Sequence, residues 1–280
     1  MAVIHIRIVT ERLNGFPADP ELIDTALGRE AVLQAWAAAV NGLASAIATV
    51  EQKICPPSMF PSRSRRDPRW GKVSAQLGDA ATAACRLGDA LNEAARWCPK
   101  ALTDGETVQY SGSQRDVRGR YVLHGYCSCR YGCGDGIELR DGPHGTVLTC
   151  VNRSSIDPIP GPWRAERHDV FTAGLILDTE PRRLYAPLTV EHAITVVRGL
   201  SAITSRIRAV LVTWQDAFET RLDRRCAVNP HGFHGPNFVR GILADLDRVR
   251  PDLTEVRTHL RNAIGVLAEI EAFPDVDRAA

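Results

Sequence analysis

Three cysteines stand within seven residues near the middle of the chain, in a glycine-rich stretch, and a fourth follows on the same segment. They are Cys127, Cys129, Cys133 and Cys150. Thiolates are ligands that zinc favours, and a structural zinc site is usually closed by four Cys or His side chains. We predict that these sulfurs hold a structural zinc ion, with His124 and His144 as alternate ligands and an iron–sulfur cluster as the second choice. The spacing Cys-x-Cys-x3-Cys differs from paired Cys-x2-Cys knuckles, so unligated thiols or a disulfide from Cys150 stay open.

A second group of metal-ligand residue types lies in the last third of the chain. It has the order Cys-x4-His-x2-His, with Cys226, His231 and His234, and Cys55 is a further member if the fold brings it near. Histidines beside Pro230 and glycines more often shape a loop, so we rate this second metal site below the first. A metal-dependent enzyme built on either group is the alternative functional hypothesis.

Arginine-rich segments form a third group with potential chemistry. The members that we expect to bind a polyanion are Arg63, Arg65, Arg66, Arg69, Trp70, Lys72, Arg224 and Arg225. Arginine forks bind phosphate well, and Trp70 would stack on a base if the polyanion is a nucleic acid. The simpler interpretation is a solvated charged loop, together with positive charge that complements a helix C-terminus.

Four segments with apolar residues at steps of three and four must position these groups. The apolar seams cover residues 33–54, 73–98, 190–218 and 239–270. This period keeps one apolar stripe on a helix and suits knobs-into-holes packing. The sequence therefore predicts an antiparallel, coiled-coil-like bundle of four helices. We expect Pro251 to kink the fourth helix without splitting it, and the seams hold no Glu, Asp or His for a diiron site.

The connections between helices predict where the chemical groups meet. Residues 55–72 join the first two helices and residues 226–235 join the last two, and short connections favour antiparallel neighbours. An up-down-up-down path would put both connections at one end of the bundle, with the N-terminus at the other. That topology would bring Cys55 to Cys226 and gather the arginines on one surface.

Residues 104–187 have a different character, because they contain eleven of the 22 glycines and short strand-like runs. We predict a small β insert there, with the cysteines in its turns. Residues 4–8 alternate apolar and polar side chains, and we expect this strand to pair with the insert's sheet at residues 119–151. The predicted organisation is an N-terminal strand (1–10), a helical hairpin (19–103), the insert (104–187), a second helical hairpin (188–273) and a tail (274–280).

Composition narrows the function classes only a little. The formal net charge is +1, so any electrostatic partner preference is local. A basic leader and a run of 18 apolar residues are both lacking, so we expect a cytoplasmic protein with reduced cysteines and no membrane association. We predict a non-enzymatic binding or scaffold protein whose partner is a protein or a nucleic acid. The seams leave open whether helical hairpins pair within one chain or across a homo-oligomer.

Overall fold

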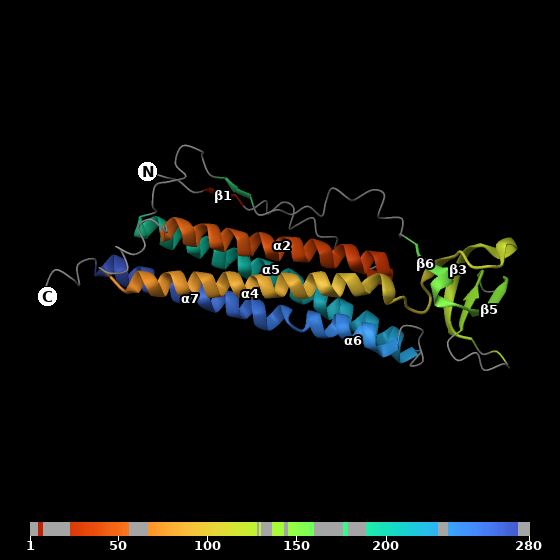
Figure 1. Ribbon diagram of the computed structural model, residues 1–280. Helices are drawn as coiled ribbons and strands as arrows, with labels where there is room; N and C mark the ends of the chain where they lie inside the picture. The colour runs from red at the N-terminus through yellow and green to blue at the C-terminus, as the bar shows by residue number, and fades with distance from the viewer. Residues whose placement is uncertain are drawn as a thin grey trace.

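The computed structural model describes residues 5–7, 23–55, 67–127, 129, 136–142, 145–159, 176–178, 189–228 and 235–273. Most of these residues are helical. A small antiparallel sheet of five strands comes between the second and third long helices in the sequence and lies at one end of the helices in space (Figure 1). The prediction of a mainly α chain with a small β sheet at this place is confirmed. The helices are α2 (Ala26–Ile54), α4 (Arg69–Trp97), α5 (Val190–Val228), α6 (Gly235–Leu246) and α7 (Val249–Ala272).

The helices begin and pack as their local sequence indicates. Thr25 caps α2 by accepting the N–H of Gly28 at 3.1 Å, and Thr189 accepts the N–H of His192 at 3.3 Å where α5 begins. The predicted apolar seams are buried in one core that all five helices share. By length and composition α2 is apolar enough to cross a membrane, but the core helix of a soluble protein passes the same test, and 61% of its apolar window is buried within the protein.

The neighbouring helices run in opposite directions. In the described chain α2 packs on α4, α4 on α7, α7 on α5 and α5 on α2. Arg69, at the start of α4, donates to the carbonyls of Glu269 (3.0 Å) and Phe273 (2.9 Å) at the end of α7. Late in α5, Arg221 forms an ion pair with Asp24, which lies just before α2. These contacts fix the directions of α4 against α7 and of α5 against α2.

The predicted topology of the connections is wrong, because the two connections lie at opposite ends of the helices. The chain passes from α2 to α4 at the end away from the sheet. It passes from α5 to α6 beside the sheet, where Phe238 of α6 packs on Trp97 with ring centroids 5.4 Å apart (Figure 1). The physical reason is the chain between β6 and α5, roughly 30 residues, which can extend to about 100 Å. That reach lets α5 start at the far end of the helices.

The fourth apolar segment forms two helices, so the prediction of one kinked helix is wrong. Residues 247–248 separate α6 from α7, and Pro251 is the third residue of α7. A proline costs little in the first turn, because the N–H that it lacks would have no helical acceptor there. The apolar seam nevertheless continues across the break, since Leu246 and Val249 are both fully buried.

The five-stranded sheet has a small core of its own. Its strands are β2 (Thr107–Tyr110), β3 (Gly119–Tyr126), β4 (Ile137–Arg140), β5 (Val147–Val151) and β6 (Ile156–Pro158), in the spatial order β5-β4-β3-β2-β6. Ala26, the first residue of α2, is buried in the same apolar cluster as the sheet residues. The sheet is therefore packed directly against the start of α2.

The N-terminal strand pairs with a different partner from the predicted one. Strand β1 (His5–Arg7) pairs with β7 (Ile176–Asp178) in a separate two-stranded sheet. The partner belongs to residues 104–187, but the prediction of pairing at residues 119–151 is wrong. Alternating side chains specify a half-buried strand without specifying its partner.

A buried ion pair ties the sheet to the helices. Arg29 of α2 and Glu106, just before β2, are 1% and 3% exposed, and their charged groups are 3.3 Å apart. The Glu106 carboxylate also accepts the backbone N–H groups of Ala26 and Thr103. Arg29 donates further to the carbonyls of Ile23 at 3.0 Å and Ala101 at 2.7 Å. This junction holds the sheet in one place relative to α2.

Candidate metal centre

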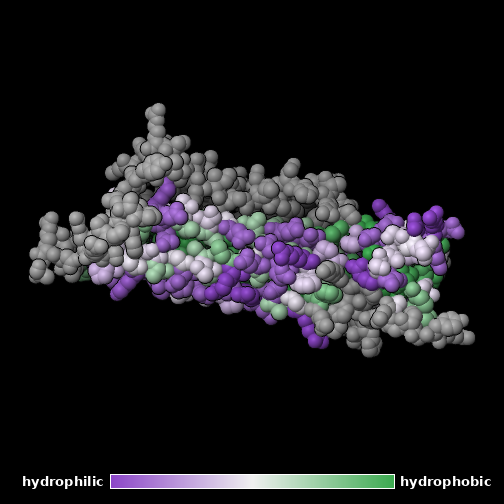
Figure 2. Space-filling model, viewed as in Figure 1, coloured by the Kyte–Doolittle hydropathy of each residue, from purple (hydrophilic) through white to green (hydrophobic). Residues whose placement is uncertain are grey.

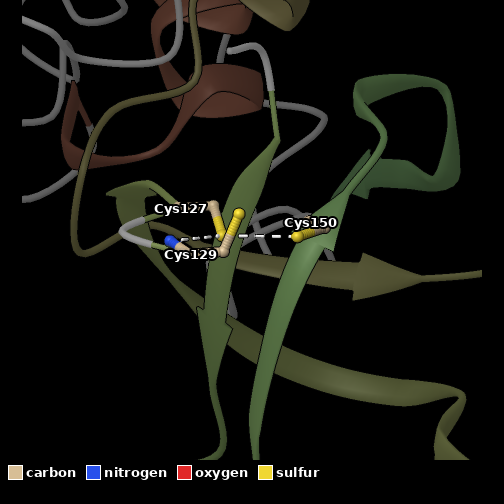
Figure 3. A group of neighbouring side chains, drawn as sticks. All are labelled: Cys127, Cys129 and Cys150. Carbon is tan, nitrogen blue, oxygen red and sulfur yellow. Dashed lines mark hydrogen bonds between the residues drawn. The ribbon is translucent and has the colours of Figure 1, made fainter. Parts of the chain in front are cut away.

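Three of the four predicted cysteine ligands meet at one end of the sheet. Cys127 directly follows β3, Cys129 lies two residues on, and Cys150 is on β5; their sulfurs all lie within 4.8 Å of one another. The sulfurs of Cys127 and Cys150 are 3.6 Å apart, well beyond the disulfide bond length of about 2.05 Å, so they are separate thiols. Figure 3 shows the three side chains pointing toward one another. Zn–S bonds of about 2.3 Å in a tetrahedron separate sulfurs by about 3.8 Å, so the cluster matches a thiolate metal site.

Two bulges in the sheet direct the Cys127 and Cys150 side chains toward each other. Between Leu123 and Tyr126, β3 has one residue more than β4, and Gly125 in this bulge has a positive φ of 78°. On the other side of β4, β5 also carries one extra residue opposite Ile137–Leu139, and Cys150 lies there with φ 58°. Bulges redirect side chains and are frequent beside functional sites. A left-handed backbone conformation is strained at a residue other than glycine. Such strain is found where the side chain of the residue has a functional role.

Hydrogen bonds of the backbone hold Cys127 and Cys129 in place. The N–H of Cys127 donates to the carbonyl of Gly136 at 2.8 Å, so these two residues lie side by side. The N–H of Cys129 donates to the Cys127 sulfur at 3.3 Å. Such a bond stabilises negative charge on sulfur, as a metal-bound thiolate carries. Cys127 and Cys129 are half-buried and Cys150 is exposed, so a metal ion can enter from solvent.

Among the described residues, no fourth side chain of a metal-ligand type joins this group. His124 is an exposed residue of β3 and is not part of the three-sulfur cluster. Cys133 and His144 lie outside the described residues. Cys98, by contrast, is buried in the helical core, and this burial raises the pKa of its thiol to about 12. It therefore stays protonated at neutral pH, and it is not part of the three-sulfur cluster.

The strain at Cys150 can be measured with two substitutions that both remove the thiol. Cys150→Gly is expected to be more stable than Cys150→Ser by about 1 kcal/mol in the presence of a chelator, because only glycine adopts the left-handed region without cost. Urea unfolding of the two variants gives this difference. Equal stabilities would mean that the positive φ does not persist in the metal-free chain.

The second predicted metal site does not assemble from the described residues. Cys55 is buried at the end of α2, where its thiol lies 3.8 Å from the Trp70 carbonyl. Cys226 is on the last turns of α5, beside the sheet. A helix of the length of α2 separates the two by roughly 40 Å, so Cys55 is wrong as a ligand of this site. His231 and His234 lie outside the described residues.

The predicted polyanion surface is divided between the two ends of the helices. Arg69 belongs to the end away from the sheet, and Arg224 and Arg225 belong to α5 at the sheet end. Trp70 is 8% exposed and packs in the helical core, so its predicted stacking on a base is wrong. Lys72 is exposed on α4. Arg63, Arg65 and Arg66 lie outside the described residues.

Arg69 acts within the fold, where it joins the start of α4 to the end of α7. Its guanidinium also pairs with the Asp67 carboxylate at 2.8 Å. The hydrogen bond from Arg69 holds the pKa of Asp67 below its ordinary value. At a pH above about 3.9, the ordinary pKa of Asp in an unfolded chain, the ion pair therefore stabilises the folded state by its full amount. This stabilisation is lost as the pH falls through the lower pKa that Asp67 has in the folded state.

Asp67→Asn is accordingly expected to reduce the loss of stability in acid. The wild-type protein should lose more unfolding free energy between pH 6 and pH 3 than this variant does. Urea unfolding at the two pH values measures the difference. Asp89→Asn, at an exposed position of α4, is the matched control. A wild-type pH response in Asp67→Asn would contradict the role of the pair.

Fold and site together define a mostly helical protein with a thiol cluster at one end of a small antiparallel sheet. Comparison of the chain with models of protein families, with curated proteins and with solved structures finds no match. The chemistry of the site rests on the convergence of Cys127, Cys129 and Cys150. The spacing of the cysteines in the sequence pointed to these residues. It gave no sign that Glu106 attaches the sheet to α2, because its partner Arg29 is 77 positions away.

Proposed function

We propose that Cys127, Cys129 and Cys150 bind one structural zinc ion, and that the protein is a non-enzymatic binding protein. The observation that carries this proposal is that three sulfurs, two from the segment just after β3 and one from β5, lie within 4.8 Å of one another. Three soft donors suit zinc, and the sheet gains most from a metal because its apolar core is small. A reducing compartment such as the cytoplasm keeps such thiols available.

A structural role is favoured over a catalytic one by the surroundings of the sulfurs. Catalytic zinc keeps an open position and has a nearby general base. Among the described residues, no carboxylate or imidazole joins the cluster. Glu138 of β4 is buried and forms an ion pair with Arg140 at 2.6 Å, so its carboxylate is already engaged.

We further propose that the helices form an antiparallel four-helix bundle, with α6 and α7 together as the fourth member, which presents the sheet to a protein partner. The buried pair Arg29–Glu106 supports a rigid attachment of the sheet, and so does Arg153, which donates to the Pro99 carbonyl at 3.2 Å. Figure 2 shows mainly hydrophilic residues along the visible face of the helices and a mixture of hydrophilic and hydrophobic residues at the sheet end. Val147 of β5 is 49% exposed there. A nucleic-acid partner is less favoured, because Arg69 and Trp70 make contacts within the fold.

Metal analysis of the purified protein tests the site. We expect one zinc ion per chain, and Cys129→Ser should weaken zinc binding by more than about 100-fold, since loss of a direct ligand exceeds the effect of an outer-shell change. Cys85→Ser is the matched control, because Cys85 is exposed on α4 and outside the cluster. Protein that folds without metal and takes up no zinc would overturn the proposal, and so would wild-type affinity in Cys129→Ser.

Removal of the metal should loosen the sheet and leave the helices intact. With a chelator, hydrogen exchange is expected to increase in β3, β4 and β5, while α4 and α7 keep their protection, because the helical core is separate from the sheet core. Exchange read by mass spectrometry on both forms gives the result. Unchanged protection in β3–β5 would show that the sheet does not depend on the metal.

A further inference from the structure

We infer that Cys127 and Cys150 form a redox pair, in which oxidation by a hydroperoxide joins their sulfurs and releases the zinc ion. The release of zinc rests on the proposed function. The disulfide step depends only on the thiol geometry and takes place in the metal-free chain as well.

The positions of the two sulfurs suit this reaction. They are 3.6 Å apart, so they must approach by about 1.5 Å to form the bond. Figure 3 shows the two side chains directed at each other across the cluster. Cys150 lies where the register of β5 shifts against β4, and Cys127 is the first residue after β3. A small rotation of side chain and backbone therefore brings them together.

Their exposures assign different roles to the two cysteines. Cys150 is exposed and is the sulfur that a dissolved oxidant reaches first, whereas Cys127 is half-buried. Redox-sensitive cysteines are accessible and stand next to a second thiol that resolves the first oxidation product. Cys127, whose sulfur lies 3.6 Å from that of Cys150, is placed to resolve the oxidised Cys150.

The reaction proceeds in two balanced steps. The Cys150 thiolate attacks the terminal oxygen of the hydroperoxide, an S–O bond forms, the O–O bond breaks, and the departing alkoxide takes a proton from water to become an alcohol. The Cys127 thiolate then attacks the Cys150 sulfur, an S–S bond forms, and the departing hydroxide takes a proton to become water. Two thiolates have lost two electrons and the hydroperoxide has gained them.

Loss of two thiolates leaves Cys129 as the one described sulfur ligand, so the zinc ion dissociates. The new disulfide then links β5 to the turn after β3, which the metal linked before. The exposed surface around Cys150 and Val147 differs between the two states. A partner bound at this end of the sheet would thus be sensitive to oxidation.

Peptide mapping of protein treated with hydrogen peroxide tests the pair directly. Trypsin cuts after Arg120, Arg130, Arg140 and Arg153, which places Cys150 and Cys133 on separate peptides and leaves Cys127 and Cys129 together. We expect peptide 121–130 linked to peptide 141–153, and fragmentation should locate the link at Cys127. Zinc-loaded protein should release one equivalent of zinc to a chromogenic indicator, and a dithiol should reverse both changes.

Variants separate the redox inference from the zinc proposal. Cys129→Ser should lose zinc binding and still form the Cys127–Cys150 link, whereas Cys127→Ser should lose the link and Cys85→Ser should behave as wild type. A chain that binds no zinc but forms the link contradicts the zinc proposal alone. A link through Cys129 or Cys133, or oxidation of Cys150 with no link at all, overturns the redox pair even where zinc binds.

Discussion

Replacement of Glu106 by alanine is expected to lower the free energy of unfolding by about 3–5 kcal/mol, one of the largest effects that a single substitution should have in this protein. The substitution leaves the Arg29 guanidinium buried without its counter-ion, and Arg29 is 1% exposed. It also removes the acceptor of the backbone N–H groups of Ala26 and Thr103. The main cost comes from the charge that stays behind and not from the lost attraction.

Denaturant unfolding followed by far-UV circular dichroism measures this effect. Glu93→Ala is the control, because Glu93 forms an ion pair with Arg96 in which the side chains are 43% and 77% exposed. That exposed pair should contribute no more than about 0.5 kcal/mol. The double variant Arg29→Met with Glu106→Leu should be more stable than Glu106→Ala, because it leaves no unpaired buried charge. A cost for Glu106→Ala as small as that of the control would show that water reaches Arg29.

The helices could be predicted from the sequence because their signal is local. An apolar stripe at steps of three and four needs only one segment to be recognised, and the predicted seams are the buried faces of α2, α4, α5, α6 and α7. The direction of α5 had no such signal. It depends on the long chain between β6 and α5, whose length permits either end of the helices as the starting point. The misplaced connections follow from that one topological error, and so does the expectation that Cys55 lies near Cys226.

The candidate metal centre, too, could be predicted from the sequence only in part. The spacing of Cys127 and Cys129 is a local property, and the glycine-rich turn around them pointed to convergence. The bulge that turns Cys150 into the cluster depends on its register with β4, which no residue type reveals. A cysteine with positive φ is rare enough that sequence reasoning would assign the conformation to a glycine instead.

Replacement of Trp36 by alanine is the second substitution expected to have a large effect, a loss of about 3–5 kcal/mol. Trp36 of α2 is fully buried and meets Trp214 and Phe218 of α5 edge to face, with ring centroids 6.0 Å and 5.7 Å apart. The cavity removes contacts from both rings. Trp97 of α4 is only partly buried, so Trp97→Ala is the matched control and should cost less.

A double-mutant cycle between Trp36 and Phe218 then tests the packing of α2 on α5. We expect a coupling energy of about 0.5–1.5 kcal/mol, the range for aromatic pairs in contact, and a value near zero would mean that the two rings do not meet. The dependence of unfolding on protein concentration decides how the helical hairpins associate. If the contact forms within one chain, the unfolding midpoint is independent of protein concentration. If it forms between two chains, the midpoint rises with concentration, because folding then includes association. We expect independence, because the apolar seams of all five helices are already buried together in one core.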